Sequence, residues 1–381
     1  IQTSALAFGG TGQSTGTESW DGTSWTEVNN LSIGRTEFVG AGATNLVALA
    51  VGGEISGGRT DATEEWAFSG IPPTSPVTDY TDAIVGQLYY NTTSSTFKVT
   101  YAGVGAWASG GNLNTARAAM GFSSNGLQTA ALSFGGNNLP GIANETEAYN
   151  GSAWTEVNNL NTARGAGGNF GIQTASLFSC GFTDANETTL VANVETWDGT
   201  NWTEVAEMNT PRFNSTGFGL NTAGLITGGN EPSASAKTEI WNGSGWTETG
   251  DLNTARSNDG GFGVSTAGII AGGSTTESWN GTSWSEVNEL NTPRTQGRGA
   301  GIQTSGLVFS GSPAPPNGGL TESWDGTSFT EIADLATPRR KGGSSGTSSS
   351  ALFFGGQGSP PKFTATEEFT LPDFVIKTLS S

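Results

Sequence analysis

A repeated phrase is the feature that most constrains what this chain can fold into. The segment TESWDGTSWTEV at Thr17 to Val28 recurs as TESWNGTSWSEV at Thr276 to Val287 and as TESWDGTSFTEI at Thr321 to Ile332. Internal repeats with a period of about 40 to 50 residues are typical of propellers and solenoids, in which each repeat is one supersecondary unit. We therefore expect a repeat architecture along most of the chain.

The spacing within the repeat is fixed as well. An aromatic residue precedes an arginine by ten positions in seven copies: Trp25 and Arg35, Trp107 and Arg117, Trp154 and Arg164, Trp202 and Arg212, Trp246 and Arg256, Trp284 and Arg294, Phe329 and Arg339. Five positions before most of these aromatics stands another, at Trp20, Tyr149, Trp197, Trp241, Trp279 and Trp324. A doublet of small residues also closes an apolar run in eight places, ending for example at Gly10, Gly53, Gly136 and Gly356.

Each repeat is expected to form four short strands. One strand follows the arginine, one is the apolar run before the doublet, and the third and fourth carry the two aromatics. The Asp-Gly or Asn-Gly between those aromatics is a strong hairpin signal that joins the third strand to the fourth. A pattern of helical periodicity is absent, so the sequence predicts an all-β protein.

The doublet after the second strand and the spaced aromatics in the third and fourth resemble the Kelch repeat. This resemblance covers nearly the whole chain outside one insertion, and it implies a β-propeller of four-stranded blades. It implies no particular activity, because propellers host many unrelated functions.

The repeat is interrupted once, between Trp66 and Trp107. These aromatics are 41 positions apart instead of five, so about 36 residues are inserted between a third and a fourth strand. Residues 107–381 then hold six complete repeats if the Trp107 strand pairs with the final third strand, Ala365 to Phe369. That count predicts a six-bladed ring, with residues 1–70 as the end of a preceding propeller. The alternative is a single eight-bladed ring that includes residues 1–70 and loops out the insertion.

The insertion, residues 71–106, differs in sequence pattern from the repeat. It opens with a Pro-rich linker, Ile71 to Val77, and continues with an alternating pattern that predicts a β-hairpin around Asn91 to Ser95. This hairpin resembles a small module of tail-fibre and other virion proteins of tailed phages. The chain itself starts at Ile1 in the middle of a repeat, so we expect an upstream piece.

Composition excludes several classes of partner. The chain has 15 Lys and Arg against 34 Asp and Glu, a formal net charge of -19. Binding to nucleic acid or to anionic membranes rests on basic patches and is disfavoured. No apolar stretch reaches the length of about 20 residues that spans a bilayer, so no membrane insertion is expected. The single cysteine, Cys180, lies in an apolar run and is predicted to be a core thiol.

The residues available for chemistry are few. There is no histidine, which excludes imidazole metal sites and acid–base catalysis by histidine. The carboxylates that recur in the third strand occupy one position in every repeat and are interpreted as structural: Glu18, Glu147, Glu195, Glu239, Glu277 and Glu322. Their expected partners are the repeated arginines, such as Arg164, Arg212, Arg256 and Arg294. The prediction is no enzyme, with no catalytic residue, no cofactor site and no metal site.

Two further motifs receive structural interpretations. The string SWDGTSW is similar to the Asp-box of sialidases, but its spacing is one residue shorter, and we interpret it as a hairpin turn. The 12 tryptophans lie nearly all at repeat positions and are predicted to form the core between blades, rather than platforms for sugars.

Differences between repeats are concentrated in the connections between second and third strands. These are residues 137–144, 183–193, 230–237, 312–319 and 357–363, and they are expected on one face, where variable loops on a rigid scaffold carry recognition. The overall style resembles repeat-rich virion proteins of tailed phages. That resemblance implies a tail-fibre or capsid-surface component with other virion proteins as partners, a host-surface glycan as candidate ligand, and a homo-oligomer as candidate assembly. The alternatives are a secreted or cell-surface adhesin and a carboxylate-based glycoside hydrolase.

Overall fold

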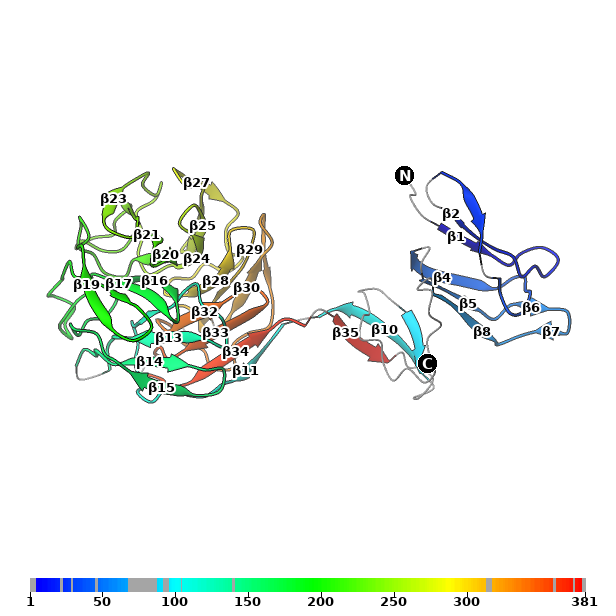
Figure 1. Ribbon diagram of the computed structural model, residues 1–381, viewed down its shortest axis with the longest axis horizontal. Coiled ribbons are helices and arrows are strands. Elements are labelled where there is room, and N and C mark those ends of the chain that lie inside the picture. The colour runs from blue at the N-terminus through cyan, green and yellow to red at the C-terminus, as the bar shows by residue number, and fades with distance from the viewer. Residues whose placement is uncertain are drawn as a thin grey trace. The chain divides into compact units, whose positions relative to one another are not determined.

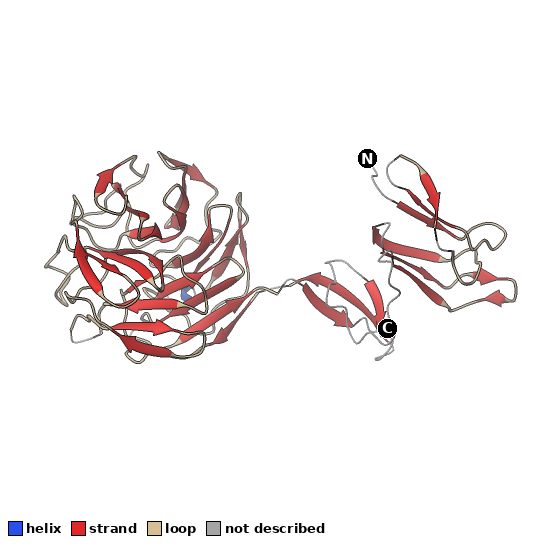
Figure 2. Cartoon of the chain, in the orientation of Figure 1, coloured by secondary structure: helices blue, strands red, loops and turns tan. Residues whose placement is uncertain are grey.

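The protein is built from β-strands in two compact units. The structure, a computed structural model, describes residues 5–20, 23–28, 30–44, 47–67, 88–91, 96–103, 105–138, 141–312, 317–358, 361–372 and 374–378. Within these residues the one helical element is a single 3-10 turn, η1 (Asn317–Gly319), drawn in blue in Figure 2. One unit consists of Ile1–Gly103 and Pro372–Ser381, and the other of Val104–Leu371.

As far as the chain is described, Val104–Leu371 holds six four-stranded antiparallel sheets (Figure 1). The first is β12 (Gly121–Phe122), β13 (Ala131–Phe134), β14 (Thr146–Tyr149) and β15 (Trp154–Val157). The second is β16 (Gly168–Ile172), β17 (Ala175–Ser179), β18 (Val194–Trp197) and β19 (Trp202–Val205). The third is β20 (Thr216–Leu220), β21 (Ala223–Thr227), β22 (Thr238–Trp241) and β23 (Trp246–Glu248).

The other three sheets repeat the same order. The fourth is β24 (Gly260–Val264), β25 (Ala267–Gly272), β26 (Thr275–Trp279) and β27 (Trp284–Val287). The fifth is β28 (Arg298–Ile302), β29 (Ser305–Phe309), β30 (Thr321–Trp324) and β31 (Phe329–Glu331). The sixth is β32 (Gly343–Gly346), β33 (Ser350–Phe354), β34 (Thr366–Thr370) and β11 (Ala106–Ser109).

The six sheets form a ring. The innermost strands β12, β16, β20, β24, β28 and β32 each contact the next, and β32 contacts β12. The sixth sheet joins the two ends of the unit, because β11 pairs with β34 and sets Trp107 opposite Phe369. The predicted pairing of the Trp107 strand with the final third strand is therefore confirmed. The predicted all-β, propeller-like fold of four-stranded sheets is confirmed with it.

The hairpin turns form as the sequence indicates. In the second sheet, Trp197 of β18 is opposite Trp202 of β19. The Asp198 carboxylate accepts hydrogen bonds from the backbone N–H groups of Thr200 at 2.8 Å and Asn201 at 2.7 Å. Gly199 between them has a φ of 95°, a conformation that a side chain would strain. The equivalent of the SWDGTSW string in this sheet is thus a hairpin turn, and the carboxylate of Asp198 closes it. In the string itself, Asp21 and Gly22 lie outside the described residues.

Tryptophans of the outermost strands link neighbouring sheets. The indole N–H of Trp202 donates to the hydroxyl of Thr146 in the preceding sheet at 3.0 Å, and Trp154 does the same with Thr366 at 3.1 Å. Trp202 and Trp154 are both buried. A buried indole needs a partner for its N–H, and the repeated threonine supplies one. The prediction that tryptophans form the core between sheets is confirmed for this ring.

The other unit contains the strands of the N-terminal residues, the strands of the insertion and the C-terminal strand. One sheet is β1 (Ala5–Phe8), β2 (Thr17–Trp20) and β3 (Trp25–Glu27), and another is β4 (Val39–Thr44), β5 (Val47–Val51) and β8 (Thr63–Ala67). A small ribbon joins β6 (Glu54–Ile55) to β7 (Gly58–Arg59). A further three-stranded sheet of this unit has the order β35 (Phe374–Thr378), β10 (Thr96–Ala102) and β9 (Leu88–Asn91).

The domain limits differ from the predicted ones at the C-terminus. The inserted hairpin is present, because β9 pairs with β10 from Asn91 opposite Thr96 onward. The tail of residues 107–381, however, leaves the ring after Leu371, and β35 pairs with β10 from Ala102 opposite Phe374 to Lys98 opposite Thr378. The described hairpin of the insertion and the tail strand therefore share one sheet, and the unit limits after Gly103 and after Leu371 differ from the predicted 1–70, 71–106 and 107–381. The linker Ile71 to Val77 lies outside the described residues.

Candidate functional site

The repeated arginines and glutamates pair inside each sheet. Each arginine stands before the innermost strand, and its partner glutamate lies on the third strand of the same sheet. In the ring the pairs are Arg117 with Glu147, Arg164 with Glu195, Arg212 with Glu239, Arg256 with Glu277, Arg294 with Glu322, and Arg339 with Glu367. Both partners are buried in every pair. The predicted structural pairing is confirmed, and it occurs within sheets.

In the third sheet, the hydrogen bonds of one buried carboxylate, Glu239, illustrate the pattern. Glu239 accepts a hydrogen bond from Arg212 Nη1 at 3.0 Å. It also accepts from the backbone N–H of Asn209 at 3.0 Å, from Asn209 Nδ2 at 2.9 Å and from the backbone N–H of Thr210 at 3.3 Å. Arg212 Nη2 donates to the carbonyl of Ile226 at 3.2 Å. The oxygens of this buried carboxylate are therefore occupied by hydrogen bonds within the sheet, in line with its structural interpretation.

Sequence reasoning missed two members of this series. Glu64 pairs with Arg35 in the first unit, and Glu367 pairs with Arg339 in the sixth sheet. The shared strings ATEEW and ATEEF carry the signal that identifies them. Glu18, by contrast, was predicted to belong to the series and is exposed on β2.

A ring of backbone hydrogen bonds encircles the axis where the innermost strands begin. Its members stand two positions after each arginine and have φ values from 52° to 62°: Ala119, Ala166, Asn214, Asn258, Gln296 and Lys341. The N–H of each donates to the carbonyl of its equivalent in the preceding sheet, for example Asn214 to Ala166 at 2.6 Å and Lys341 to Gln296 at 3.1 Å. Ala119 donates to Lys341 at 2.9 Å and closes the ring. The sequence gives no sign of it, because the six residues share no side-chain type.

A polar hollow lies at this ring of backbone bonds. It has about 520 Å³ of empty space, open solvent included, and residues from all six innermost strands or the segments before them line it. The charged side chains among them are Asp259, Arg298 and Lys341. Arg298 Nε donates to the carbonyl of Gly342 at 2.6 Å, and its guanidinium lies 5.4 Å from the centre of the Phe122 ring. The start of β28 and the segment just before β32 thus place positive charge at the hollow.

Burial changes the proton affinity of these groups. It raises the pKa of Asp259 to about 7, although the positive charge of Arg256 acts in the opposite direction. It lowers the pKa of Arg298 to about 10. It also lowers the pKa of Lys341, which the carboxylate of Glu187 raises in part. Near neutral pH the guanidinium stays charged while Asp259 is partly protonated.

At the other end of the innermost strands, one residue forms hydrogen bonds to three of them. Asn125 donates from its backbone N–H to the carbonyl of Gly171 at 2.9 Å and from Nδ2 to the carbonyl of Gly263 at 2.6 Å. Its Oδ1 accepts from the backbone N–H of Gly219 at 2.9 Å. The first sheet therefore reaches across to the second, third and fourth through a single asparagine.

The variable loops lie on the face where the hollow begins. Five sheets join the start of the innermost strand to the start of the loop by a β-bridge: Ala118 with Asn137, Gly165 with Phe182, Phe213 with Asn230, Thr295 with Ser312, and Arg340 with Gln357. The fourth sheet lacks such a loop, because β25 ends at Gly272 and β26 begins at Thr275. The expectation that the variable loops share one face is confirmed for their described residues.

Cys180 is a core residue, as predicted. Its side chain is fully buried in a cluster with Phe170, Leu177 and Trp241. Burial raises the pKa of its thiol to about 11. A thiol that keeps its proton is a poor nucleophile.

Metal and membrane features are not found where the chain is described. In those residues, no group of three or more His, Cys, Asp or Glu side chains is placed to hold a metal ion. No helix in the described part of the chain has the length and apolar character that crossing a bilayer requires.

Comparison with known proteins addresses the fold. No protein-family model and no curated protein matches the sequence. A solved structure described as "Structure of YjhT" matches with a TM-score of 0.56 and 11% sequence identity, over 70% of this chain and 99% of that chain. The chain has a propeller-like fold. At this identity the likeness says nothing about activity, because one fold hosts many unrelated functions.

Proposed function

We propose that this chain is a non-enzymatic recognition protein that binds its target through the face bearing the variable loops. The observation that carries the proposal is the contrast between scaffold and loops. The repeated arginines and glutamates are paired inside the sheets, whereas the differences between repeats are concentrated in loops beside the start of the innermost strands. Rigid scaffolds that present variable loops are a common arrangement for binding.

The proposed location is the surface of a phage virion, as a tail-fibre or capsid-surface component. Two features support it: the Kelch-like repeats in a polar chain with few charged residues, and the inserted hairpin that resembles a module of virion proteins. Other virion proteins are the expected structural partners, and a host-surface glycan is the expected ligand. Self-association into a homo-oligomer fits the same role.

A secreted or cell-surface adhesin is the second candidate, because it would use the same loop face. A glycoside hydrolase is less well supported. Such enzymes generally use a pair of carboxyl groups on either side of the scissile bond. Among the described residues that line the hollow, Asp259 is the one carboxylate.

Binding of the full chain to an array of bacterial surface glycans tests the recognition role. The informative variant replaces the second-sheet loop, residues 183–193, by the short Gly273–Ser274 connection of the fourth sheet. The fourth sheet shows that the fold accepts this connection. A matched control changes the opposite end of the same sheet, at Thr200 in the turn between β18 and β19.

We expect the wild-type chain and the Thr200→Ala control to bind the same glycans, and at least one of five such loop replacements to lose that binding. Glycan binding that survives all five replacements would place recognition elsewhere on the molecule. If the wild-type chain binds no glycan, a glycan ligand is rejected and a purely structural role remains.

A further inference from the structure

Two cations line the hollow at positions where the equivalent residues of other sheets are neutral. Arg298 stands four positions after the paired arginine, where the other sheets have Gly121, Gly168, Thr216, Gly260 and Gly343. Lys341 stands two positions after it, where the other sheets have Ala119, Ala166, Asn214, Asn258 and Gln296. The repeat does not need either cation, because at each of the two positions the other five sheets have a neutral residue. A role beyond the scaffold therefore has to be considered for both.

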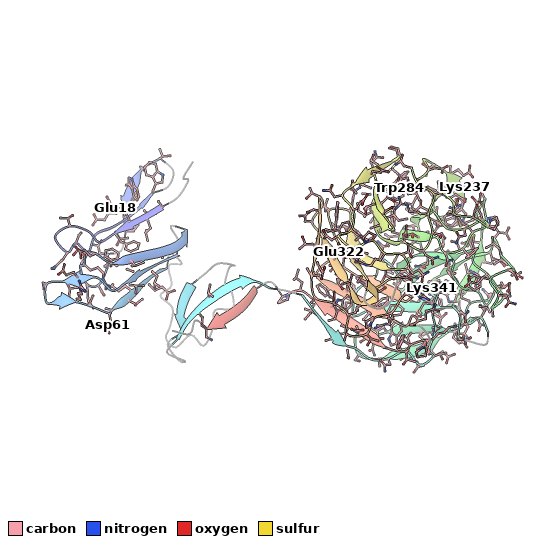
Figure 3. The ribbon with its side chains drawn as sticks, turned by 180° about the vertical axis from the view of Figure 1, so that it is seen from behind. Glu18, Asp61, Lys237, Trp284, Glu322 and Lys341 are labelled. Carbon is pink, nitrogen blue, oxygen red and sulfur yellow. The ribbon has the colours of Figure 1, made fainter. Side chains whose placement is uncertain are left out.

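Lys341 is also placed against its backbone preference. Its φ is 56°, a conformation that Asn and Asp accept more readily than residues with long side chains. The third and fourth sheets have asparagine at the equivalent positions, Asn214 and Asn258. Figure 3 shows Lys341 near the middle of the ring and Lys237 toward its edge.

Neither cation is neutralised by an ion pair with a described residue. Arg298 donates to two backbone carbonyls, Gly342 at 2.6 Å and Gly297 at 2.7 Å, and stacks on Phe122. Among the described residues, Arg298 Nη2 and Lys341 Nζ have no hydrogen-bond acceptor and no carboxylate within 4.0 Å. Both side chains are half-buried. A cation that is partly removed from water without a counter-charge is stabilised by an anion that binds beside it.

The carboxylates near the hollow do not supply that compensation in full. Burial keeps Asp259 partly protonated at neutral pH, since its pKa is raised to about 7. The negative charge of Glu187 raises the pKa of Lys341, but Glu187 is an exposed residue of the second-sheet loop. The remaining polar lining near the two cations includes the side chains of Asn214 and Asn258. The hollow thus offers a guanidinium, an ammonium and amides in a chain whose net charge is -19.

We propose that the hollow binds a small oxyanion, a carboxylate or a phosphate, between Arg298 and Lys341. The guanidinium would hold two oxygens of the anion through planar N–H donors, and the ammonium would bind as a compact charge. The hollow is open to solvent, so a small anion can reach the two cations. This site is separate from the loop recognition proposed above, and each can fail without the other.

The test is isothermal titration of the full chain at low ionic strength with inorganic phosphate, and separately with acetate. The variants are Arg298→Thr and Lys341→Asn, each of which introduces a residue that an equivalent position already holds in the third sheet. Lys237→Ala is the charge-matched control, because Lys237 pairs with Glu231 and does not line the hollow. Thermal unfolding of each variant checks that the fold is kept.

We expect saturable binding of one anion per chain, weakened about tenfold or more by either variant and little changed in the control; each tenfold corresponds to about 1.4 kcal/mol. Tighter binding of phosphate would indicate a phosphate ligand, and tighter binding of acetate a carboxylate; both outcomes support the site. The proposal is overturned if neither anion binds saturably to the wild-type chain. It is equally overturned if a folded variant that combines Arg298→Thr with Lys341→Asn binds the anion as tightly as the wild-type chain.

Discussion

Removing one buried carboxylate of the repeat should cost far more stability than removing its exposed neighbour. In the third sheet, Glu239→Ala leaves the guanidinium of Arg212 buried without its counter-charge and takes the acceptor from Asn209 and Thr210. Breaking a buried ion pair by removing one partner costs about 3–5 kcal/mol. For a unit of this size, that corresponds to a fall in Tm on the order of 10 °C.

The matched control is Glu248→Ala. Glu248 lies directly opposite Glu239 on the neighbouring strand but is exposed, so its removal should cost less than about 0.5 kcal/mol. Urea unfolding of the full chain, followed by tryptophan fluorescence, measures both free energies. If the loss arises from an unpaired buried charge, Arg212→Met combined with Glu239→Leu should recover part of it. Equal stability of Glu239→Ala and Glu248→Ala would refute the structural interpretation of the series.

Three further predictions follow from individual buried groups. Asp259 binds a proton in the folded chain up to about pH 7, well above its ordinary pKa, so its stabilising contribution is full at low pH and is lost as the pH rises through 7. Asp259→Asn should therefore raise the Tm relative to wild type at pH 8 and much less at pH 4.5; the same shift at both values would contradict this. Cys180 should resist a thiol reagent such as DTNB at pH 8 in the folded chain and react fully in urea, whereas rapid reaction of the folded chain would place the thiol at the surface. Asn125→Ala removes hydrogen bonds to Gly219 and Gly263 and should speed amide hydrogen exchange in β20 and β24, while unchanged exchange would show that the bridge is dispensable.

The features that repeat along the chain could be predicted from the sequence, because each copy confirms the others. The ten-residue interval from Trp202 to Arg212, the hairpin at Asp198 and the pairing of Arg212 with Glu239 all belong to this class. The closing pair of Trp107 with Phe369 could also be predicted, because the interruption after Trp66 leaves one strand without its neighbour.

The features that break the repeat could not be predicted in the same way. The pairing of β35 with β10 joins segments almost at opposite ends of the chain, and no local pattern in Phe374–Thr378 signals its partner. Asn125 acts through the backbone carbonyls and amides of other sheets, which have no sequence signature. Arg298 and Lys341 look like ordinary surface residues until the ring brings their positions to one axis.

The measurement that tests the central claim most directly is immunogold labelling of intact particles and cells from the sample in which this chain is made. The antibody is raised against the propeller, Val104–Leu371. We predict label on phage-like particles, at the tail if the loop face recognises a host and over the capsid if the chain decorates the particle. Label confined to cell surfaces or to the medium would contradict the virion assignment and support a secreted adhesin.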